Sequence, residues 1–386
     1  MKTLFTTTYQ SKKSGSRARR GVLQTAHGAV QTPAFVPVAT KGTIKGLTPA
    51  QIGSIPLQIS FVNTYHLVTH PGSAIVQSGG YIHAYSGMQQ PLMSDSGGFQ
   101  VFSLAERARR AKVRGDEEPL LISINESGVM FRSIYDGTLI EFTPEKSMQY
   151  QTEIGADINM AFDECTYHPA THGYAEKSMK RTHDWLTRCI AYRSEHRHPT
   201  YQQYLYGVIQ GSMYEDLRIQ SAQYVTKQLV DGIAIGGVSV GESKQDMRDQ
   251  VGWVRDSLPT DKPVHLLGVG HIDDIIELVH HGIDTFDCVE PTRLARMGIL
   301  IDLKHLDKQI NQWESHEIDI TQNVYKSEMN ETLLGLQNAA PVTFSYAHHL
   351  FKQKELLGYT YATIHNLMQM ERLMARIREE IEQDRV

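Results

Sequence analysis

The sequence predicts an α/β protein folded as a (β/α)8 barrel, and three observations support this prediction. Short apolar runs bounded by Gly, Asp or Ser recur eight times, amphipathic helical patterns separate most of them, and polar residues gather where the runs end. The runs are rich in Val, Ile, Leu and Phe without strict alternation, which is typical of parallel strands buried on both faces. Eight strand–helix repeats favour a barrel, with a doubly wound sheet as the alternative.

The expected strands follow one another along the first three quarters of the chain. They cover residues 32–38, 57–63, 91–98, 157–164, 204–211, 232–237, 263–270 and 284–289. Helical patterns lie between them, for example over 175–193 and 272–282. Beyond residue 300 a polar, irregular stretch precedes a C-terminal helix, expected over 366–386. Met370, Met374, Ile377 and Ile381 recur there at helical spacing and predict one apolar, packed face.

Composition indicates a globular protein of a reducing compartment. The 386 residues are 40% apolar and 21% charged, which suits a large core. There is no apolar run of about 18 residues and no apolar signal segment at the N-terminus, so we expect a cytoplasmic protein without a membrane span. Cys165, Cys189 and Cys288 lie far apart without a CxxC pair, which argues against a disulfide framework.

Charge gives only local hints about partners. The net charge of −5 is no global sign of nucleic-acid binding. Residues 1–22 and 106–114 are nevertheless basic, which fits either solvated loops or a local surface for phosphates. Charge alone does not decide between these two interpretations.

Polar residues concentrate at the C-terminal ends of the expected strands. A single Asp at such a place commonly caps a helix or a turn. In a barrel, however, these ends converge on one rim, where catalytic groups lie. The convergence of the set therefore favours a functional site, formed by Asp95, Asp163, Gln210, Gly236, Gly237, Gly268 and Asp287.

Sequence motifs in this order resemble the tRNA-guanine transglycosylases, most closely the bacterial members. The matching segments are TPAFVPVATKGTIKGLTP, NTYHL, SDSGGFQVFSL, FRSIYDGTLIEFTPEKS, MAFDECT, GVIQGS, AIGGVSVGE, LLGVG, FDCVEPTRLARMG, HHLFKQKELLG and HNL, across nearly the whole chain. SDSGGFQ together with FDC and PTR is highly specific. The resemblance implies a single (β/α)8 catalytic domain over 1–386. It also implies an exchange of the wobble guanine of GUN-anticodon tRNAs for a 7-deazaguanine.

The resemblance also implies the reaction chemistry. Asp287, in FDC, would be the nucleophile that captures ribose C1′ as a covalent intermediate, which the incoming base then displaces with retention. Asp95, in SDSGG, would transfer protons and take part in recognition of the base. Gly268, in LLGVG, could offer a backbone N–H to Asp287.

The remaining expected site residues bind the base and the RNA. Asp163 would accept guanine N1–H and N2–H2, whereas Gln210 and Gly237 would answer O6. Phe99 and Leu267 would sandwich the flat base, one side by aromatic stacking. Ser96 is also expected in the base pocket. Arg293 and Arg296 would hold the anticodon loop beside the nucleophile through forked hydrogen bonds.

The chain departs from the family at its structural zinc site, which uses CxCxxC and a histidine. The three cysteine positions fall on Leu334, Leu336 and Ala339, and only His365 remains. Because thiolates are the main ligands of such a site, we expect no zinc and no other cofactor, and a degenerate zinc-like subdomain over 300–365. Leu334 and Leu336 would replace the metal by an apolar plug.

Smaller departures bear on the substrate. Glu290 stands where Met is usual, and His265 where Tyr is usual. Val240, in GVSVGE, favours 7-aminomethyl-7-deazaguanine (preQ1), because members that use queuine tend to carry glycine there. Queuine or another deazaguanine stays possible. Residues 105–122 are expected to be an insertion, basic and then acidic.

Two alternative functions remain open at this stage. One is a deazaguanine transglycosylase acting on DNA or another RNA. The other is a non-catalytic partner subunit, which retained catalytic carboxylates and lost zinc ligands disfavour. The resemblance further implies a homodimer and tRNA as the partner, with no membrane.

Overall fold

Eight parallel strands form the centre of the protein in the computed structural model, which describes residues 4–99, 121–133, 135–335 and 340–386. The order of the sheet is β4-β14-β13-β12-β11-β10-β6-β5. A parallel bridge between Val38 and Phe61 joins the two outer strands, so the sheet closes into a barrel. The strands are β4 (Ala34–Pro37), β5 (Ser60–Val62), β6 (Leu92–Ser94), β10 (Ile158–Met160), β11 (Tyr204–Ile209), β12 (Gly232–Ile235), β13 (Val264–Leu266) and β14 (Thr285–Cys288). All eight lie within the expected runs. The barrel is therefore confirmed and the open, doubly wound sheet is wrong.

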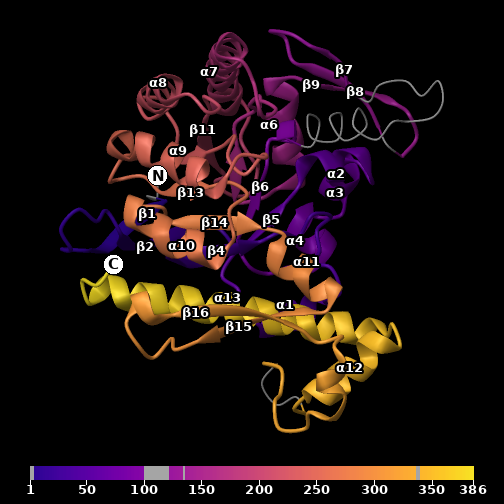
Figure 1. Ribbon diagram of the computed structural model, residues 1–386. Helices are drawn as coiled ribbons and strands as arrows, with labels where there is room; N and C mark the ends of the chain where they lie inside the picture. Colours follow the sequence, from indigo (N-terminus) through magenta and orange to yellow (C-terminus); the bar gives the residue numbers. More distant parts are fainter. Residues whose placement is uncertain (1–3, 100–120, 134, 336–339) are drawn as a thin grey trace.

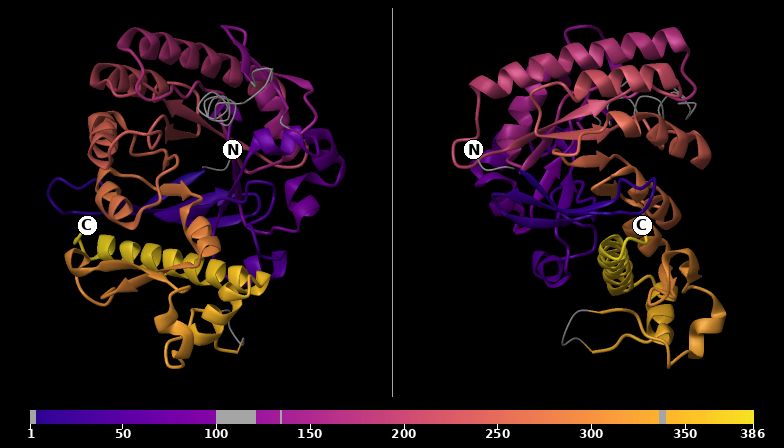
Figure 2. Two further views of the ribbon diagram at one scale, coloured as in Figure 1. Left: turned by 45° about the vertical axis from the view of Figure 1, so that its right-hand side comes forward. Right: turned by 90° about the vertical axis from the view of Figure 1, so that its left-hand side faces the viewer.

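Helices follow the strands and surround the barrel (Figures 1 and 2). They are α1 (Pro49–Ser54), α2 (Thr64–Thr69), α3 (Ser73–Ser78), α4 (Tyr81–Ser86), α6 (Pro144–Ile154), α7 (His172–Glu195), α8 (Glu215–Val225), α9 (Lys244–Val254), α10 (Ile272–Leu278) and α11 (Glu290–Met297). Local sequence signals set their ends. Ser243 caps α9 in a capping box with Asp246, and α6 stops at Gly155, which adopts the left-handed conformation.

An antiparallel sheet packs against the amino ends of the barrel strands. It consists of β1 (Phe5–Gln10), β2 (Arg19–Thr25) and β3 (Gly28–Thr32). Leu23 and Val30 of this sheet are buried in one apolar cluster with the barrel residues Phe61 and Tyr206. The sheet therefore closes one end of the barrel and leaves the opposite end for a site.

A second small sheet lies between β6 and α6 along the chain. Its strands are β7 (Leu121–Ile124), β8 (Val129–Arg132) and β9 (Leu139–Phe142). The insertion expected over 105–122 falls outside the described residues except for its last two positions, which begin β7.

The C-terminal region packs beside the barrel around one long helix. The hairpin of β15 (Ile299–Lys304) and β16 (Glu314–Asp319) is followed by α12 (Phe344–Lys352) and α13 (Leu356–Glu382). Helix α13 runs along the hairpin in Figure 1, and the apolar face expected from its spacing is buried in the main core.

The expected start of the C-terminal helix at residue 366 is wrong. Helix α13 begins ten residues earlier, because no proline interrupts 356–366 and Gly358 is accommodated where its backbone approaches Leu350. No helix in the described part of the chain, α13 included, combines the length and the apolar character that crossing a bilayer requires.

Candidate active site

A cavity of about 690 Å³ lies at the carboxyl ends of the barrel strands. Every strand contributes to its wall through a residue at or just beyond its end. These residues are Val38, Asn63, Asp95, Asp163, Gln210, Gly237, Gly268 and Asp287, in the order of the strands along the chain. The convergence expected from the sequence is therefore present in the structure.

Asp287 points one carboxylate oxygen at the protein and leaves the other toward the cavity. Its Oδ1 accepts the Gly268 backbone N–H at 2.9 Å and lies 3.2 Å from His265 Nε2. Among the described residues, Oδ2 has no hydrogen-bond partner, although Asp287 lines the cavity. The Gly268 contact is the one that the sequence led us to expect. An anchored carboxylate with one free oxygen has the geometry of a nucleophile.

The sequence led us to expect that His265 could alter hydrogen bonding near Asp287, and the structure adds which atoms it contacts. It is fully buried in β13, and its Nδ1 lies 2.8 Å from the Thr285 hydroxyl. If the hydroxyl donates to Nδ1, the proton of the neutral imidazole must be on Nε2, where it can be donated to Asp287. Thr285, His265 and Asp287 thus form one hydrogen-bonded chain. Only the pairing of β13 with β14 brings them together.

Asp95 lies in the cavity wall directly after β6, and residues at the start of α2 hold its carboxylate. Its Oδ1 accepts the Thr64 backbone N–H at 2.6 Å, and its Oδ2 accepts Asn63 Nδ2 at 2.6 Å. The Thr64 hydroxyl also donates to the Asp95 carbonyl oxygen at 2.6 Å. The NTYHL motif therefore positions this carboxylate.

Asp163 and Gln210 form a hydrogen-bonded pair in the cavity wall. Ser96 Oγ donates to Asp163 Oδ1 at 2.9 Å, and Gln210 Nε2 donates to Asp163 Oδ2 at 2.8 Å. Burial raises the pKa of Asp163, whereas these two hydrogen bonds act in the opposite direction. The Ser96–Asp163–Gln210 connection fixes the orientation of the Gln210 amide.

Gln210 and Gly237 face each other closely. Gln210 Oε1 is buried and has no hydrogen-bond partner among the described residues. A Cβ at Gly237, whose φ is +62°, would lie 2.2 Å from that oxygen. Glycine is thus needed here both for its backbone conformation and for space. A buried acceptor without a partner costs free energy, so this oxygen is suited to a donor brought by a ligand.

The other residues expected to contact the base also line the cavity. Phe99 is 47% exposed and Leu267 is half-buried, so both have surface left for a ligand. The loop after β12 is braced by Glu242, whose carboxylate accepts the backbone N–H groups of Ser239 and, at 2.9 Å, Val240. Val240 reaches the cavity wall.

A basic cluster of Lys41, Lys45, Arg293 and Arg296 lies beside the cavity. Burial lowers the pKa of Lys45, and the charges of the other three cations lower it further. Arg293 is exposed and lines the cavity, whereas Arg296 donates to the Thr292 carbonyl at 2.6 Å. The two lysines were missed from the sequence, although KGTIK carries them, because their proximity to the arginines appears only in the fold.

Glu290 lies at the cavity edge beside this cluster. Its Oε1 is 3.0 Å from His271 Nε2, and the charge of Arg293 also acts on it. The carboxylate therefore interacts with both an imidazole and an arginine of the cluster.

The residues of the zinc-like region do not fit a zinc site. His365 Nδ1 accepts the Leu334 backbone N–H at 2.9 Å, so its Nε2 carries the proton and donates to the Ile301 carbonyl at 2.9 Å. Both nitrogens are thus engaged, and no thiolate stands at the three family positions. Leu334 contributes its backbone here, while Leu336 and Ala339 lie outside the described residues.

Comparison with known proteins shows the family to which this chain is similar. The family model described as Queuine tRNA-ribosyltransferase matches residues 13–386. A queuine tRNA-ribosyltransferase of Psychrobacter cryohalolentis is 42% identical over 96% of this chain and 91% of its own length. Those of Herpetosiphon aurantiacus and Thermoanaerobacter pseudethanolicus are 40% and 42% identical, over 98% and 97% of this chain and 89% and 93% of theirs.

Proposed function

Since the chain belongs to the queuine tRNA-ribosyltransferase family and is a pentosyltransferase of tRNA, we propose that it exchanges the wobble guanine of GUN-anticodon tRNAs for a 7-deazaguanine. The observation that supports this most directly is Asp287. Its carboxylate is anchored through Oδ1 and leaves Oδ2 at a cavity bounded by donors and acceptors for a purine.

In the proposed reaction, Asp287 Oδ2 attacks ribose C1′ as the bond to guanine N9 breaks. The carboxylate and the ribose then share a covalent ester-like bond, and the leaving guanine takes up a proton. The incoming base forms its own bond to C1′ and releases the carboxylate, so two inversions retain the anomeric configuration. The Gly268 N–H keeps Oδ1 in place through both steps.

We assign the proton transfers to Asp95, because it lines the same cavity and is firmly held by Asn63 and Thr64. Asp163 faces guanine N1–H and N2–H2, and Gly237 offers its backbone N–H to O6. The expected contact of Gln210 with O6 is revised: its Nε2 donates to Asp163, so we propose that its unpartnered Oε1 accepts a ligand N–H instead. Phe99 and Leu267 cover the faces of the base.

We propose preQ1 as the favoured incoming base. Val240 narrows the cavity next to a loop whose Glu242 carboxylate accepts two backbone N–H groups. A small aminomethyl substituent needs less room there than the cyclopentenediol of queuine.

The basic cluster supports RNA as the substrate. Its four cations are adjacent, lie next to the cavity and can hold phosphates of an anticodon loop. A single-stranded loop can present the target guanine unstacked, as a site at the bottom of a cavity requires.

We further propose that the C-terminal region holds no zinc. His365 replaces it with two hydrogen bonds that tie the Leu334 segment to β15. Leu334, one of the two residues expected to form an apolar plug, thus contacts His365 through its backbone N–H.

The test is incorporation of labelled guanine into unmodified tRNA-Tyr by the native protein and by Asp287→Asn. Label at the wobble position with the native protein alone supports the proposal, and a denaturation-resistant protein–RNA adduct supports the covalent step. Competition by preQ1 and queuine identifies the preferred base. Label from both proteins excludes Asp287 as the nucleophile. Label in duplex DNA and not in tRNA favours the alternative substrate.

A further inference from the structure

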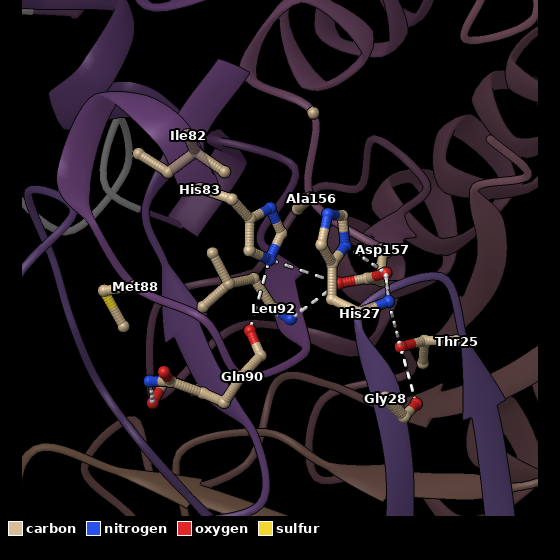
Figure 3. Close-up of polar contacts among 12 residues, drawn as sticks. Thr25, His27, Gly28, Ile82, His83, Met88, Gln90, Leu92, Ala156 and Asp157 are labelled. Carbon is tan, nitrogen blue, oxygen red and sulfur yellow. Dashed lines mark hydrogen bonds and ion pairs between the residues drawn. The ribbon is translucent and has the colours of Figure 1, made fainter. Parts of the chain in front are cut away.

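A cluster of two histidines and one aspartate lies at the end of the barrel opposite the active site. His27 is in the turn between β2 and β3, His83 is in α4, and Asp157 directly precedes β10. Figure 3 shows both imidazoles pointing at the Asp157 carboxylate. Three segments that are far apart in the sequence thus direct their polar atoms to one point.

The carboxylate of Asp157 is deeply buried and has no permanent cation beside it. Its side chain is 0% exposed, and it accepts the backbone N–H groups of Leu92 at 3.0 Å and His27 at 3.3 Å. In the described part of the chain, Asp157 pairs with the imidazoles of His27 and His83, His198 also lies close enough to interact with it, and no Lys or Arg pairs with it. A buried anion needs a counter-charge. Within the described residues, the available one is a proton on an imidazole or an ion held by it.

The ligand atoms have the spacing of a transition-metal site. His27 Nδ1 lies 2.9 Å from Asp157 Oδ1, and His83 Nε2 lies 3.5 Å from Asp157 Oδ2. All three groups offer ligand atoms within 4.8 Å of one another. Around Zn²⁺, with ligands at about 2.0–2.2 Å, neighbouring ligand atoms are roughly 3.3 Å apart. The Gln90 carbonyl oxygen accepts a hydrogen bond from His83 Nε2 at 3.2 Å, and once a metal replaces that proton it is close enough to supply a fourth position.

From this geometry we propose that His27, His83 and Asp157 bind one divalent transition-metal ion of the Zn²⁺ or Co²⁺ type. Two imidazoles and a carboxylate suit these borderline cations better than Mg²⁺ or Ca²⁺, which prefer oxygen ligands. The site ties the β2–β3 turn to α4 and to the start of β10. Its role is to fasten the sheet that closes this end of the barrel.

Binding requires a small movement of His27. The two rings are stacked in this structure, with centroids 3.5 Å apart and planes 13° apart, whereas a ligated metal lies near the plane of each ring. The His27 side chain is 25% exposed, against 10% for His83 and 0% for Asp157, so we expect the His27 ring to be the one that turns, away from its contact with Tyr201.

Ligation also requires the lone pairs of His27 Nδ1 and His83 Nε2. Each neutral imidazole must therefore place its proton on its other nitrogen. In this structure His83 Nε2 is hydrogen-bonded to the Gln90 carbonyl oxygen, so on metal binding its proton moves to Nδ1, which has no partner among the described residues. Protons compete for the same nitrogens, so binding weakens in acid.

The experiment measures Zn²⁺ binding to the full chain by equilibrium dialysis at pH 7.5, with Co²⁺ as a spectroscopic probe. We expect the protein to bind one equivalent of Zn²⁺ when free Zn²⁺ is micromolar. The protein loaded with Co²⁺ should show the visible absorption bands of a low-symmetry site. His27→Gln, in the turn, should weaken binding at least tenfold and abolish the thermal stabilisation by Zn²⁺. His83→Gln should act in the same direction.

Two matched variants locate the site. His172→Gln changes an exposed histidine that pairs with Asp216 at 2.9 Å, and it should leave binding unchanged. His365→Gln should also bind one equivalent. Loss of binding in His365→Gln would place the metal in the C-terminal region and overturn this assignment. Equal binding by native protein and His27→Gln, or no stoichiometric binding at all, would overturn it as well. None of these readouts depends on the proposed reaction.

Discussion

His265 holds the proposed nucleophile from the side away from the cavity, and its removal should slow the reaction. His265→Phe keeps an aromatic ring beside Phe61, whose centroid is 5.8 Å away, but leaves Asp287 Oδ1 with the Gly268 N–H alone. A hydrogen bond to a charged group contributes about 1.5–3 kcal/mol, so we expect kcat to fall roughly tenfold or more. KM for the base should change little, and the acid limb of the kcat pH profile should move.

Steady-state guanine exchange across pH 5–9 measures these effects. Thr285→Val removes the hydroxyl that orients the imidazole and should give a smaller loss in the same direction. An unchanged kcat and an unchanged pH profile in His265→Phe would show that Gly268 alone positions Asp287.

Gly237 should be intolerant of even one methyl group. In Gly237→Ala the new Cβ would meet Gln210 Oε1 at 2.2 Å, on a backbone with φ of +62°. The Gln210 amide must then move and weaken its 2.8 Å hydrogen bond to Asp163. We expect KM for guanine to rise about tenfold, as loss of one charged hydrogen bond implies. Gly252→Ala in α9, where nothing lies within 4 Å of the new Cβ, should leave KM unchanged.

Among the elements, α13 carries a buried carboxyl that makes stability depend on pH. Burial raises the pKa of Glu371 to about 8, from an ordinary value of 4.5, and its Oε1 has no hydrogen-bond partner among the described residues. The unfolded chain loses this proton near pH 4.5, whereas the folded protein keeps it to about pH 8. Stability from this group is therefore present in acid and is lost as pH rises through that window.

Glu371→Gln imitates the protonated carboxyl and removes this dependence. We expect its urea midpoint, relative to native protein, to improve as pH rises from 5 to 8. The difference in the free energy of unfolding between Glu371→Gln and native protein should change by no more than about 1.4 kcal/mol per pH unit. Glu379→Gln, on the exposed side of the same helix, should show no such trend. If the urea midpoints of Glu371→Gln and native protein differ by the same amount at pH 5 and pH 8, Glu371 is not the source of the pH dependence.

Elements differed in how readily the sequence revealed them. The barrel strands were found because burial on both faces makes each an apolar run, as in Ile233–Ile235. The edge sheets escaped because their strands carry exposed polar side chains, as β1 (Phe5–Gln10) and β16 (Glu314–Asp319) do. Helix α13 was placed ten residues too short because its first turns have a weaker apolar pattern than Met370–Ile381.

For the molecule as a whole, the sequence predicted which strand-end residues meet at the cavity more readily than it predicted the side chains that surround them. Asp95, Asp163, Gln210 and Asp287 follow from the strand pattern, because barrel closure brings any such residues to one cavity. The contacts of His265, within β13, depend instead on which residue of β14 pairs with it. Lys45 approaches Arg293 and Arg296 only because the β4–α1 loop and α11 meet at one rim.

Binding of RNA at that rim should follow the local charge and not the net charge of −5. Each cation that contacts a phosphate releases about one counterion, so the logarithm of affinity falls with the logarithm of salt in proportion to the number of contacts. Lys45→Gln and Arg293→Gln should each weaken tRNA binding and make this slope shallower by roughly one, and the double variant by roughly two. Lys227→Gln changes an exposed lysine between α8 and β12, at the opposite end of the barrel, and should alter neither quantity. Filter binding between 50 and 300 mM salt measures the slopes. If the rim variants keep the native salt dependence and Lys227→Gln makes it shallower, the RNA binds on another face of the protein. The anticodon would then reach Asp287 from that face.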